Sequence, residues 1–188
     1  MNLERISNHS TAICGEINVG KTTLINELKK MGYKTLILDD YVNYLYQNNN
    51  DLINEFKNKI GNFILENNKI SKELLKKYIL DDFNNIYKLE EIIYPYISNH
   101  LINNKYDFVE IPVLESKKID FSGFFKYVVV VHKKTKFLVE NQLINWLNNK
   151  NNYIIDRKRK NTNLKFVDIY NDNHDISKKI KKILVKTQ

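Results

Sequence analysis

One eight-residue segment near the start of the chain limits the possible folds more than any other feature. Residues 15–22 read GEINVGKT and fit the pattern G-x-x-x-x-G-K-[ST] at every fixed position. The segment follows a short apolar run and opens a helical pattern, which is the context in which such a loop binds phosphate. Backbone N–H groups around residues 17–22 and the positive end of the helix dipole would surround an anion there. The sequence therefore predicts a strand–loop–helix unit that binds a nucleotide.

Individual residues of this loop have distinct expected roles. Gly20 lets the backbone approach a phosphate closely. Lys21 reaches the β- and γ-phosphates of the nucleotide, and Thr22 offers its hydroxyl to Mg²⁺. We expect the residues that contact the nucleotide to be Gly15, Glu16, Ile17, Asn18, Val19, Gly20, Lys21, Thr22 and Thr23.

Short apolar runs alternate with helical patterns along the rest of the chain. The runs predict five strands, at residues 11–14, 35–38, 106–111, 127–132 and 166–170. Four consecutive valines at residues 128–131 are typical of a strand that is buried on both faces of a parallel sheet. The sequence therefore predicts an α/β fold, a three-layer sandwich around a five-stranded parallel sheet.

A chain of 188 residues is expected to form a single domain, residues 1–188. Residues 41–105 carry no strand signal, and their apolar residues recur at helical spacing. They predict a helical subdomain inserted between strands, with Ser71 as a helix cap and Pro95 kinking or restarting a helix. Residues 133–150 read as a helix that continues through residues 153–155, and the basic run of residues 157–160 follows.

Composition bears on partners and location. The net charge of +8 would suit nucleic-acid binding, but the lysines are spread along the chain and reflect a bias toward residues with A/T-rich codons. We therefore expect no nucleic-acid partner.

No segment reaches the ~20 apolar residues of a membrane span, and the first ten residues do not resemble a secretory signal. The single cysteine, Cys14, excludes a disulfide framework. These features predict a cytoplasmic protein, and they leave its oligomeric state open.

The phosphate-binding loop does not identify the phosphate acceptor. A GTPase needs a base-reading N-K-x-D, and the only match, residues 104–107, precedes the third predicted strand instead of following a later one. A motor ATPase would be larger. The length fits a small-molecule kinase that uses ATP, with the second substrate under the helical insertion and a lid over the phosphates at residues 133–160.

Carboxylates follow two of the predicted strands. Asp39 and Asp40 end the second strand, where a carboxylate can accept a proton from an attacking hydroxyl or hold Mg²⁺. They could instead cap a helix that begins at Tyr41. Glu110 ends the third strand, and it either holds Mg²⁺ through water or is a surface carboxylate.

The order and spacing of these elements resemble the dephospho-coenzyme A kinase family over most of the chain. Residues 32–46 are similar to the family's second strand and its D-x-D-like end, with Asp39 in the place of the catalytic aspartate. Residues 70–75 resemble an I-D-R-x-x-L element, in which Lys72 takes the place of arginine. Residues 89–97 resemble L-x-x-I-x-H-P-x-I, with Tyr94 in place of histidine.

The resemblance continues to the end of the chain. Residues 110–115, which include Glu110 and Pro112, are similar to the family's D-x-P-L-L-F-E, and Asn171 matches the asparagine after its final strand. The lid arginines of the family are replaced here by Lys133, Lys134 and Lys136. Arg157 and Arg159, two of only three arginines in the chain, are expected to substitute for them at the ATP phosphates. Lys158 and Lys160 are expected to be solvated.

The resemblance implies a kinase that phosphorylates the ribose 3′-hydroxyl of dephospho-coenzyme A with ATP. Asp39 would be the base, Thr22 and Glu110 would hold Mg²⁺, and Arg157, Arg159 and Asn171 would contact ATP. The substrate residues implied are Asp39, Lys72, Tyr94, Glu110 and Pro112. Two alternatives remain open: another nucleoside or nucleotide kinase, and a nucleotide-binding module that has lost catalysis. Whether Asp39 or Asp40 is the base is open as well.

Overall fold

The computed structural model describes residues 10–133, 141–171 and 176–187, and the side chains of all of these except 176 and 177. The chain forms two compact units. The sheet unit comprises Met1–Leu38, Asn104–Glu115 and Asp120–Gln188, and the insertion unit comprises Asp39–Asn103 and Ser116–Ile119.

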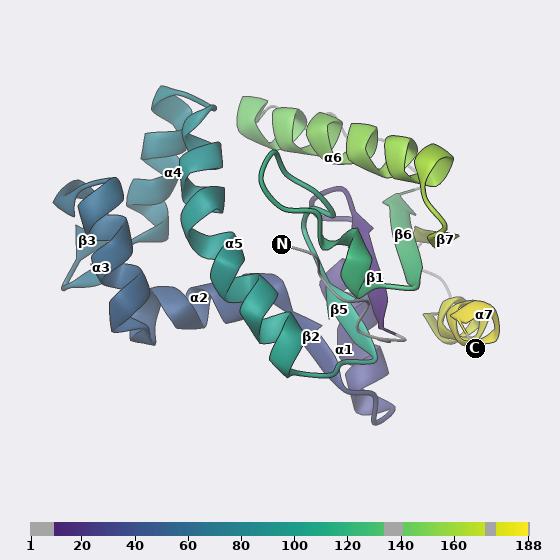
Figure 1. Ribbon diagram of the computed structural model, residues 1–188. Helices are drawn as coiled ribbons and strands as arrows, with labels where there is room; N and C mark the ends of the chain where they lie inside the picture. Colours follow the sequence, from purple (N-terminus) through teal and green to yellow (C-terminus); the bar gives the residue numbers. More distant parts are fainter. Residues whose placement is uncertain (1–9, 134–140, 172–175, 188) are drawn as a thin grey trace. The chain divides into compact units, whose positions relative to one another are not determined.

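The sheet unit contains the five-stranded parallel sheet that the sequence predicts (Figure 1). Its strands are β1 (Thr11–Gly15), β2 (Thr35–Ile37), β5 (Phe108–Glu110), β6 (Tyr127–Lys133) and β7 (Lys165–Asn171). They lie in the order β2-β5-β1-β6-β7, so β1 is central, and its Ile13 pairs with Glu110 and with Val129. This order brings the carboxyl ends of β1, β5 and β6 to one edge, beside the loop that follows β1.

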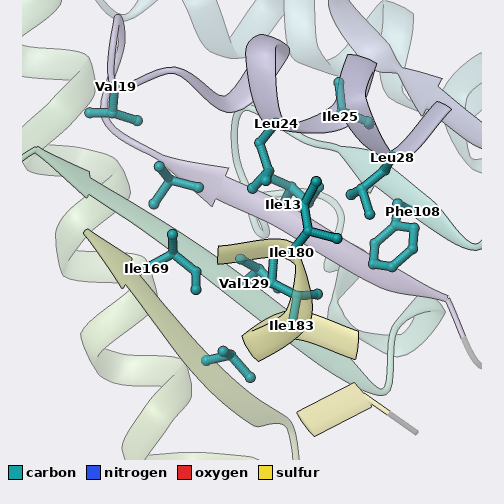
Figure 2. Packing of buried hydrophobic residues seen from close by; sticks show 12 residues of the cluster. Ile13, Val19, Leu24, Ile25, Leu28, Phe108, Val129, Ile169, Ile180 and Ile183 are labelled. Atoms are coloured by element: carbon teal, nitrogen blue, oxygen red, sulfur yellow. The ribbon is translucent and has the colours of Figure 1, made fainter. Parts of the chain in front are cut away.

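Helices cover both faces of this sheet. α1 (Lys21–Lys30) and α7 (Ile176–Thr187) share one face, where Leu24, Leu28 and Ile183 pack against β1, β6 and β7 (Figure 2). α6 (Gln142–Asn161) contacts the other face, because its Arg159 bonds Asp168, which alternates along β7 with the core residues Val167 and Ile169. Helices on both faces of the sheet make three layers, as the sequence predicts.

Two differences from the sequence expectation bear on the candidate site. β2 ends at Ile37, and α2 (Leu38–Asn48) starts at the next residue, whereas the sequence predicted a strand through Leu38. α6 begins at Gln142 and extends through the basic run, whereas the prediction was a helix over 133–150 that continues through 153–155, with the basic run beyond it. Residues 134–140, which include the expected lid lysines Lys134 and Lys136, lie outside the described residues.

The insertion unit is mainly helical, but it contains one hairpin that the sequence analysis missed. Its helices are α2, α3 (Asn50–Lys59), a 3₁₀ turn η1 (Asn62–Ile64), α4 (Lys72–Asp81) and α5 (Asn85–Asn103). Strands β3 (Leu65–Glu66) and β4 (Lys69–Ile70) pair antiparallel across Asn67 and Asn68. Those two asparagines have φ values of 50° and 59°, which a tight two-residue hairpin turn requires. The prediction that residues 41–105 contain no strand is therefore wrong.

Two local predictions in the helices can be checked directly. Ser71 is the N-cap residue of α4, as predicted, although its side chain makes no capping hydrogen bond. α5 runs through Pro95 without interruption, so the helix does not restart there. Among the described residues, no helix combines the length and apolar character needed to cross a membrane.

Candidate nucleotide-binding and catalytic site

The loop between β1 and α1 adopts a backbone conformation that requires its two glycines. Gly20 has φ 94° and Gly15 has φ 143°. A Cβ atom on Gly15 would lie 2.3 Å from the carbonyl oxygen of Val131, and one on Gly20 would lie 2.3 Å from Asn171 Nδ2. Asn18, at φ 65°, is the other residue of this loop in the left-handed region. The motif glycines therefore serve both the turn and its close packing against β6 and β7.

The Lys21 side chain lies over the loop. Its Nζ donates hydrogen bonds to the carbonyl oxygens of Gly15, at 3.2 Å, and Glu16, at 2.7 Å. Both acceptors belong to the loop itself, so the ammonium group stays beside the N–H groups that would bind phosphate. Its flexible stem lets it turn from those carbonyls to a phosphate oxygen.

Thr22 and Glu110, the two residues expected to hold a metal, lie in contact. Thr22 Oγ1 is 3.2 Å and 3.1 Å from the two carboxylate oxygens of Glu110. Glu110 is 6% exposed at the end of β5. One hydroxyl and one carboxylate fit Mg²⁺, which completes its shell with phosphate oxygens and water. In the described part of the chain no cluster of three or more His, Cys, Asp or Glu side chains could hold a metal ion, so such a site would depend on the nucleotide phosphates.

Three asparagines of α6 contact the first half of the loop, and the sequence analysis missed them. Asn148 Oδ1 accepts a hydrogen bond from the Ile17 N–H at 2.9 Å. Asn151 Nδ2 donates to the Gly15 carbonyl at 3.3 Å, and Asn152 Nδ2 donates to Glu16 Oε1 at 2.9 Å. The Ile17 N–H was expected to face phosphate, but it donates its hydrogen bond to α6 instead. The sequence offered one signal for them, the asparagine-rich stretch at residues 148–152.

Asn171 joins the end of β7 to the same loop. Its Nδ2 donates to the Val19 carbonyl at 2.7 Å, and its Oδ1 accepts from Lys179 Nζ of α7 at 3.1 Å. The structure therefore places Asn171, Lys21, Thr22 and Glu110 around one loop.

The basic run is part of α6, and it is tied to carboxylates of the sheet unit. Arg157 pairs with Glu115 at 2.6 Å. Lys158 pairs with Glu115 at 2.7 Å and also with Asp120, and it is only 6% exposed. Burial alone would lower the pKa of Lys158, but its hydrogen bonds to Asp120 and Glu115 raise it above its usual value. The prediction that Lys158 is solvated is therefore wrong.

Arg159 binds Asp168 with two hydrogen bonds. Arg159 Nη1 donates to Asp168 Oδ2 at 2.9 Å, and Nη2 donates to Oδ1. His132 Nε2 lies 2.7 Å from the same Oδ1. The hydrogen bond from Arg159 is the main reason that the pKa of Asp168 lies below its ordinary value. The expected contact of Arg157 or Arg159 with ATP stays a prediction, and either residue would have to share its carboxylate partner to make it.

We expect Arg159→Lys to lower the free energy of unfolding by about 0.5–1 kcal/mol at pH 7, because lysine cannot make the paired hydrogen bonds. Since the pKa of Asp168 is depressed in the folded protein, the stabilisation is present above the ordinary carboxyl pKa of about 3.9 and is lost as the pH falls below it. Urea unfolding at pH 7 and at pH 3 measures both values. An equal loss at the two pH values would contradict this account.

The same variant tests the expected nucleotide contact. If Arg159 also contacts ATP, the KM for ATP should rise about tenfold, which corresponds to about 1.4 kcal/mol. Arg157→Lys is measured in parallel, because Arg157 lies in the same helix as Arg159 and makes an ion pair with Glu115. An unchanged KM in both variants and in their combination would make these residues stabilising only.

Asp39 and Asp40 lie in the first turn of α2, in the insertion unit, and both are exposed. The expectation that they end the second strand is wrong, because α2 already begins at Leu38. For the same reason neither caps a helix beginning at Tyr41. Acidic residues in a first turn interact favourably with the helix dipole, which accounts for one role of the pair without excluding another.

Tyr94, another residue of the insertion unit implied in substrate binding, is buried in α5. Burial raises its pKa well above the ordinary value, and the nearby charges of Glu90 and Asp39 raise it further. Asp39 and Tyr94 therefore share one environment. Lys72 is exposed at the first position of α4. Pro112, in the sheet unit, is exposed just beyond β5.

The N-K-x-D match at residues 104–107 has a structural role. Asp107 Oδ2 accepts a hydrogen bond from the Lys34 N–H at 2.7 Å, just before β5 begins. This is the amino end of the strand, whereas the phosphate-binding loop is at the carboxyl end of β1. The segment therefore does not form a base-reading motif. This agrees with the sequence analysis, which argued against one.

A central parallel strand, the loop after it and the Thr22–Glu110 pair define a P-loop nucleotide-binding protein of the α/β class. The family model described as dephospho-CoA kinase matches residues 10–159. The chain therefore belongs to the dephospho-CoA kinase family, which confirms the resemblance found in the sequence.

Individual proteins give the same picture. The dephospho-CoA kinase of Rickettsia bellii is 32% identical over 137 residues, 64% of this chain and 63% of that protein. That of Buchnera aphidicola is 29% identical over 116 residues, 58% of this chain and 54% of that protein. The matched segment thus spans less than two thirds of these curated relatives.

Solved structures are similar over nearly the whole chain. Dephospho-CoA kinase from Campylobacter jejuni has a TM-score of 0.57 at 20% identity, covering 95% of this chain and 96% of that one. A protein from Thermus thermophilus has a TM-score of 0.61 at 17% identity, covering 95% and 97%. At such low identity these likenesses show the fold, which is that of the P-loop kinases.

Proposed function

We propose that this protein transfers the γ-phosphoryl group of ATP to the ribose 3′-hydroxyl of dephospho-CoA, giving CoA and ADP. Membership of the dephospho-CoA kinase family supports this reaction. The observation that carries the proposal is the contact of Thr22 with the buried Glu110 beside the loop at residues 15–22. A hydroxyl and a carboxylate in that position suit a nucleotide bound with its metal.

The loop and Lys21 bind and orient the phosphates of ATP in this mechanism. The N–H groups that follow Ile17 and the amino end of α1 face the β- and γ-phosphates. Lys21 Nζ moves from the carbonyls of Gly15 and Glu16 to the phosphate oxygens, where it stabilises charge in the transition state. Mg²⁺, when bound, supplies further neutralisation of phosphate charge, and Thr22 and Glu110 are the residues that would hold it.

Asp39 accepts the proton of the 3′-hydroxyl as that oxygen attacks the γ-phosphorus. Its exposure lets an acceptor reach it, and Tyr94 shares its environment. Lys72 and Pro112 are the other proposed substrate contacts. Asn171, Arg157 and Arg159 are proposed to contact ATP, as the family resemblance implies.

A coupled assay of ADP release over a panel of acceptors tests this proposal. We expect turnover with dephospho-CoA, a product heavier by one phosphoryl group, and little turnover with nucleosides or nucleoside monophosphates. Preference for one of those acceptors would make the protein a different small-molecule kinase. Nucleotide binding with no turnover on any acceptor would make it a binding module.

The proposed metal role predicts a specific response to Glu110→Gln. The amide keeps the size of the side chain but removes its negative charge, so the variant should need at least tenfold more Mg²⁺ for half-maximal activity. Titration of Mg²⁺ at saturating ATP measures this. Glu115→Gln is the control, because Glu115 pairs with Arg157 and Lys158 instead of Thr22. An unchanged Mg²⁺ requirement in Glu110→Gln would exclude this carboxylate as a metal ligand.

A further inference from the structure

The three asparagines of α6 lie on one face of that helix and contact three consecutive residues of the phosphate-binding loop. Their spacing of three and four residues places them on the same side. Their partners are the carbonyl of Gly15, the carboxylate of Glu16 and the N–H of Ile17. α6 therefore holds the first half of the loop, and the half that follows is left to face phosphate.

Asn151 is poorly placed if its role is only to stabilise the fold. It is 6% exposed, and asparagine is an unfavourable residue in a helix interior. Its Nδ2 donates to Gly15, but within the described chain no group donates a hydrogen bond to its Oδ1. A buried polar atom without a partner is destabilising. An apolar side chain of similar size would suit this position better, except for the contact with the loop.

That contact involves the same carbonyl that Lys21 uses. The Gly15 oxygen accepts from Asn151 Nδ2 at 3.3 Å and from Lys21 Nζ at 3.2 Å. When Lys21 turns to a phosphate, Gly15 keeps its hydrogen bond to α6. The loop can therefore hold its conformation while its lysine changes partners.

Asn152 forms a hydrogen bond with the Glu16 carboxylate, whose negative charge is unfavourable in a phosphate site. Glu16 places a carboxylate in the loop, where it repels a nucleotide phosphate. The hydrogen bond from Asn152 Nδ2 at 2.9 Å holds that carboxylate on α6.

From these contacts we propose that Asn148, Asn151 and Asn152 are positioning residues for phosphoryl transfer. They fix the loop in the shape that binds the nucleotide, and they act through the loop without touching the substrate. This inference rests on the proposed binding of ATP at the loop.

The sharpest test is Asn151→Leu, because the proposal predicts opposite effects on stability and on binding. We expect the Tm to stay the same or rise, since an unsatisfied buried amide is replaced by an apolar side chain. We expect the Kd for ADP, measured by calorimetry, to rise at least tenfold. The reason is that the Gly15 carbonyl loses its hydrogen bond from Asn151, so the loop is no longer fixed. The KM for dephospho-CoA should not change. Asn149→Leu is the matched control, since Asn149 is an exposed neighbour on the same helix.

A falling Tm with an unchanged Kd for ADP would show Asn151 to be merely structural. Unchanged values of both the Tm and the Kd would also overturn the proposal.

If Asn151→Leu does not fold, the partly exposed Asn152 provides the decisive measurement. Asn152→Ala should weaken ADP binding, and the effect should largely disappear in a Glu16→Gln background. An equal effect in both backgrounds, or no effect in either, would contradict the inference.

The readout distinguishes this inference from the proposed function. ADP affinity does not depend on the phosphate acceptor. A protein that binds ADP but leaves dephospho-CoA unphosphorylated would refute the proposed reaction, and the asparagine variants would still be decided by their Kd values.

Discussion

Lys21→Ala should lower the turnover number by about 10²–10³ and leave the fold intact. In the proposed mechanism the lysine contributes positive charge where negative charge develops on the transferring phosphoryl group. Its Nζ donates hydrogen bonds to two loop carbonyls, and neither is part of the hydrophobic core. Steady-state kinetics with dephospho-CoA and a thermal melt of the same sample measure the two quantities.

Lys29→Ala is the control for this prediction, because Lys29 is an exposed lysine in the last turn of the same helix. It should turn over like the unchanged protein. If Lys21→Ala kept a turnover number within tenfold of that value, the loop at residues 15–22 could not be the catalytic one.

Asp39→Asn should lower turnover by about 10²–10⁴, the usual contribution of a positioned base. Its affinity for ATP should be unchanged, because in the proposed mechanism Asp39 acts on the acceptor hydroxyl. Asp40→Asn should have a much smaller effect. The two carboxylates are consecutive in α2, so they point about 100° apart around the helix axis and cannot reach the same proton.

Turnover of both variants and their Kd for ATP are the measurements needed. The pair is its own matched control, since both side chains are exposed acids in the same helical turn. The reverse order of effects would assign the base to Asp40. Two variants with normal turnover would remove both carboxylates from the mechanism.

The sheet and its loop could be predicted from the sequence because their signals are local. The valine run of β6 and the G-x-x-x-x-G-K-T pattern after β1 each carry their own structural requirement. Glu110 could be assigned to a strand end near the loop, because the ends of parallel strands share one edge. Its contact with Thr22, 88 residues away in the chain, follows from that arrangement.

Most of the residues that the sequence analysis missed are asparagines, which are so frequent in this chain that a run of them carries little information. Asn67 and Asn68 form a hairpin turn, and Asn148, Asn151 and Asn152 bind the loop, but asparagine is so frequent in this chain that neither run stood out. The β3 and β4 strands have only two residues each, too short for a periodicity to show. Lys158 was missed because its partners, Glu115 and Asp120, are about 40 residues distant.

The boundaries of the insertion unit have a consequence for protein engineering. The tip of the β5–β6 connection, Ser116–Ile119, belongs to that unit, so the chain passes between the two units four times instead of twice. Within the tip, Lys117 lies 4.0 Å from the centre of the Tyr87 ring, and Lys118 pairs with Glu91. A chimaera that exchanged only residues 39–103 with a relative would carry a foreign α5 against this native tip. An exchange of the insertion unit that keeps these contacts therefore needs two cassettes, transplanted together.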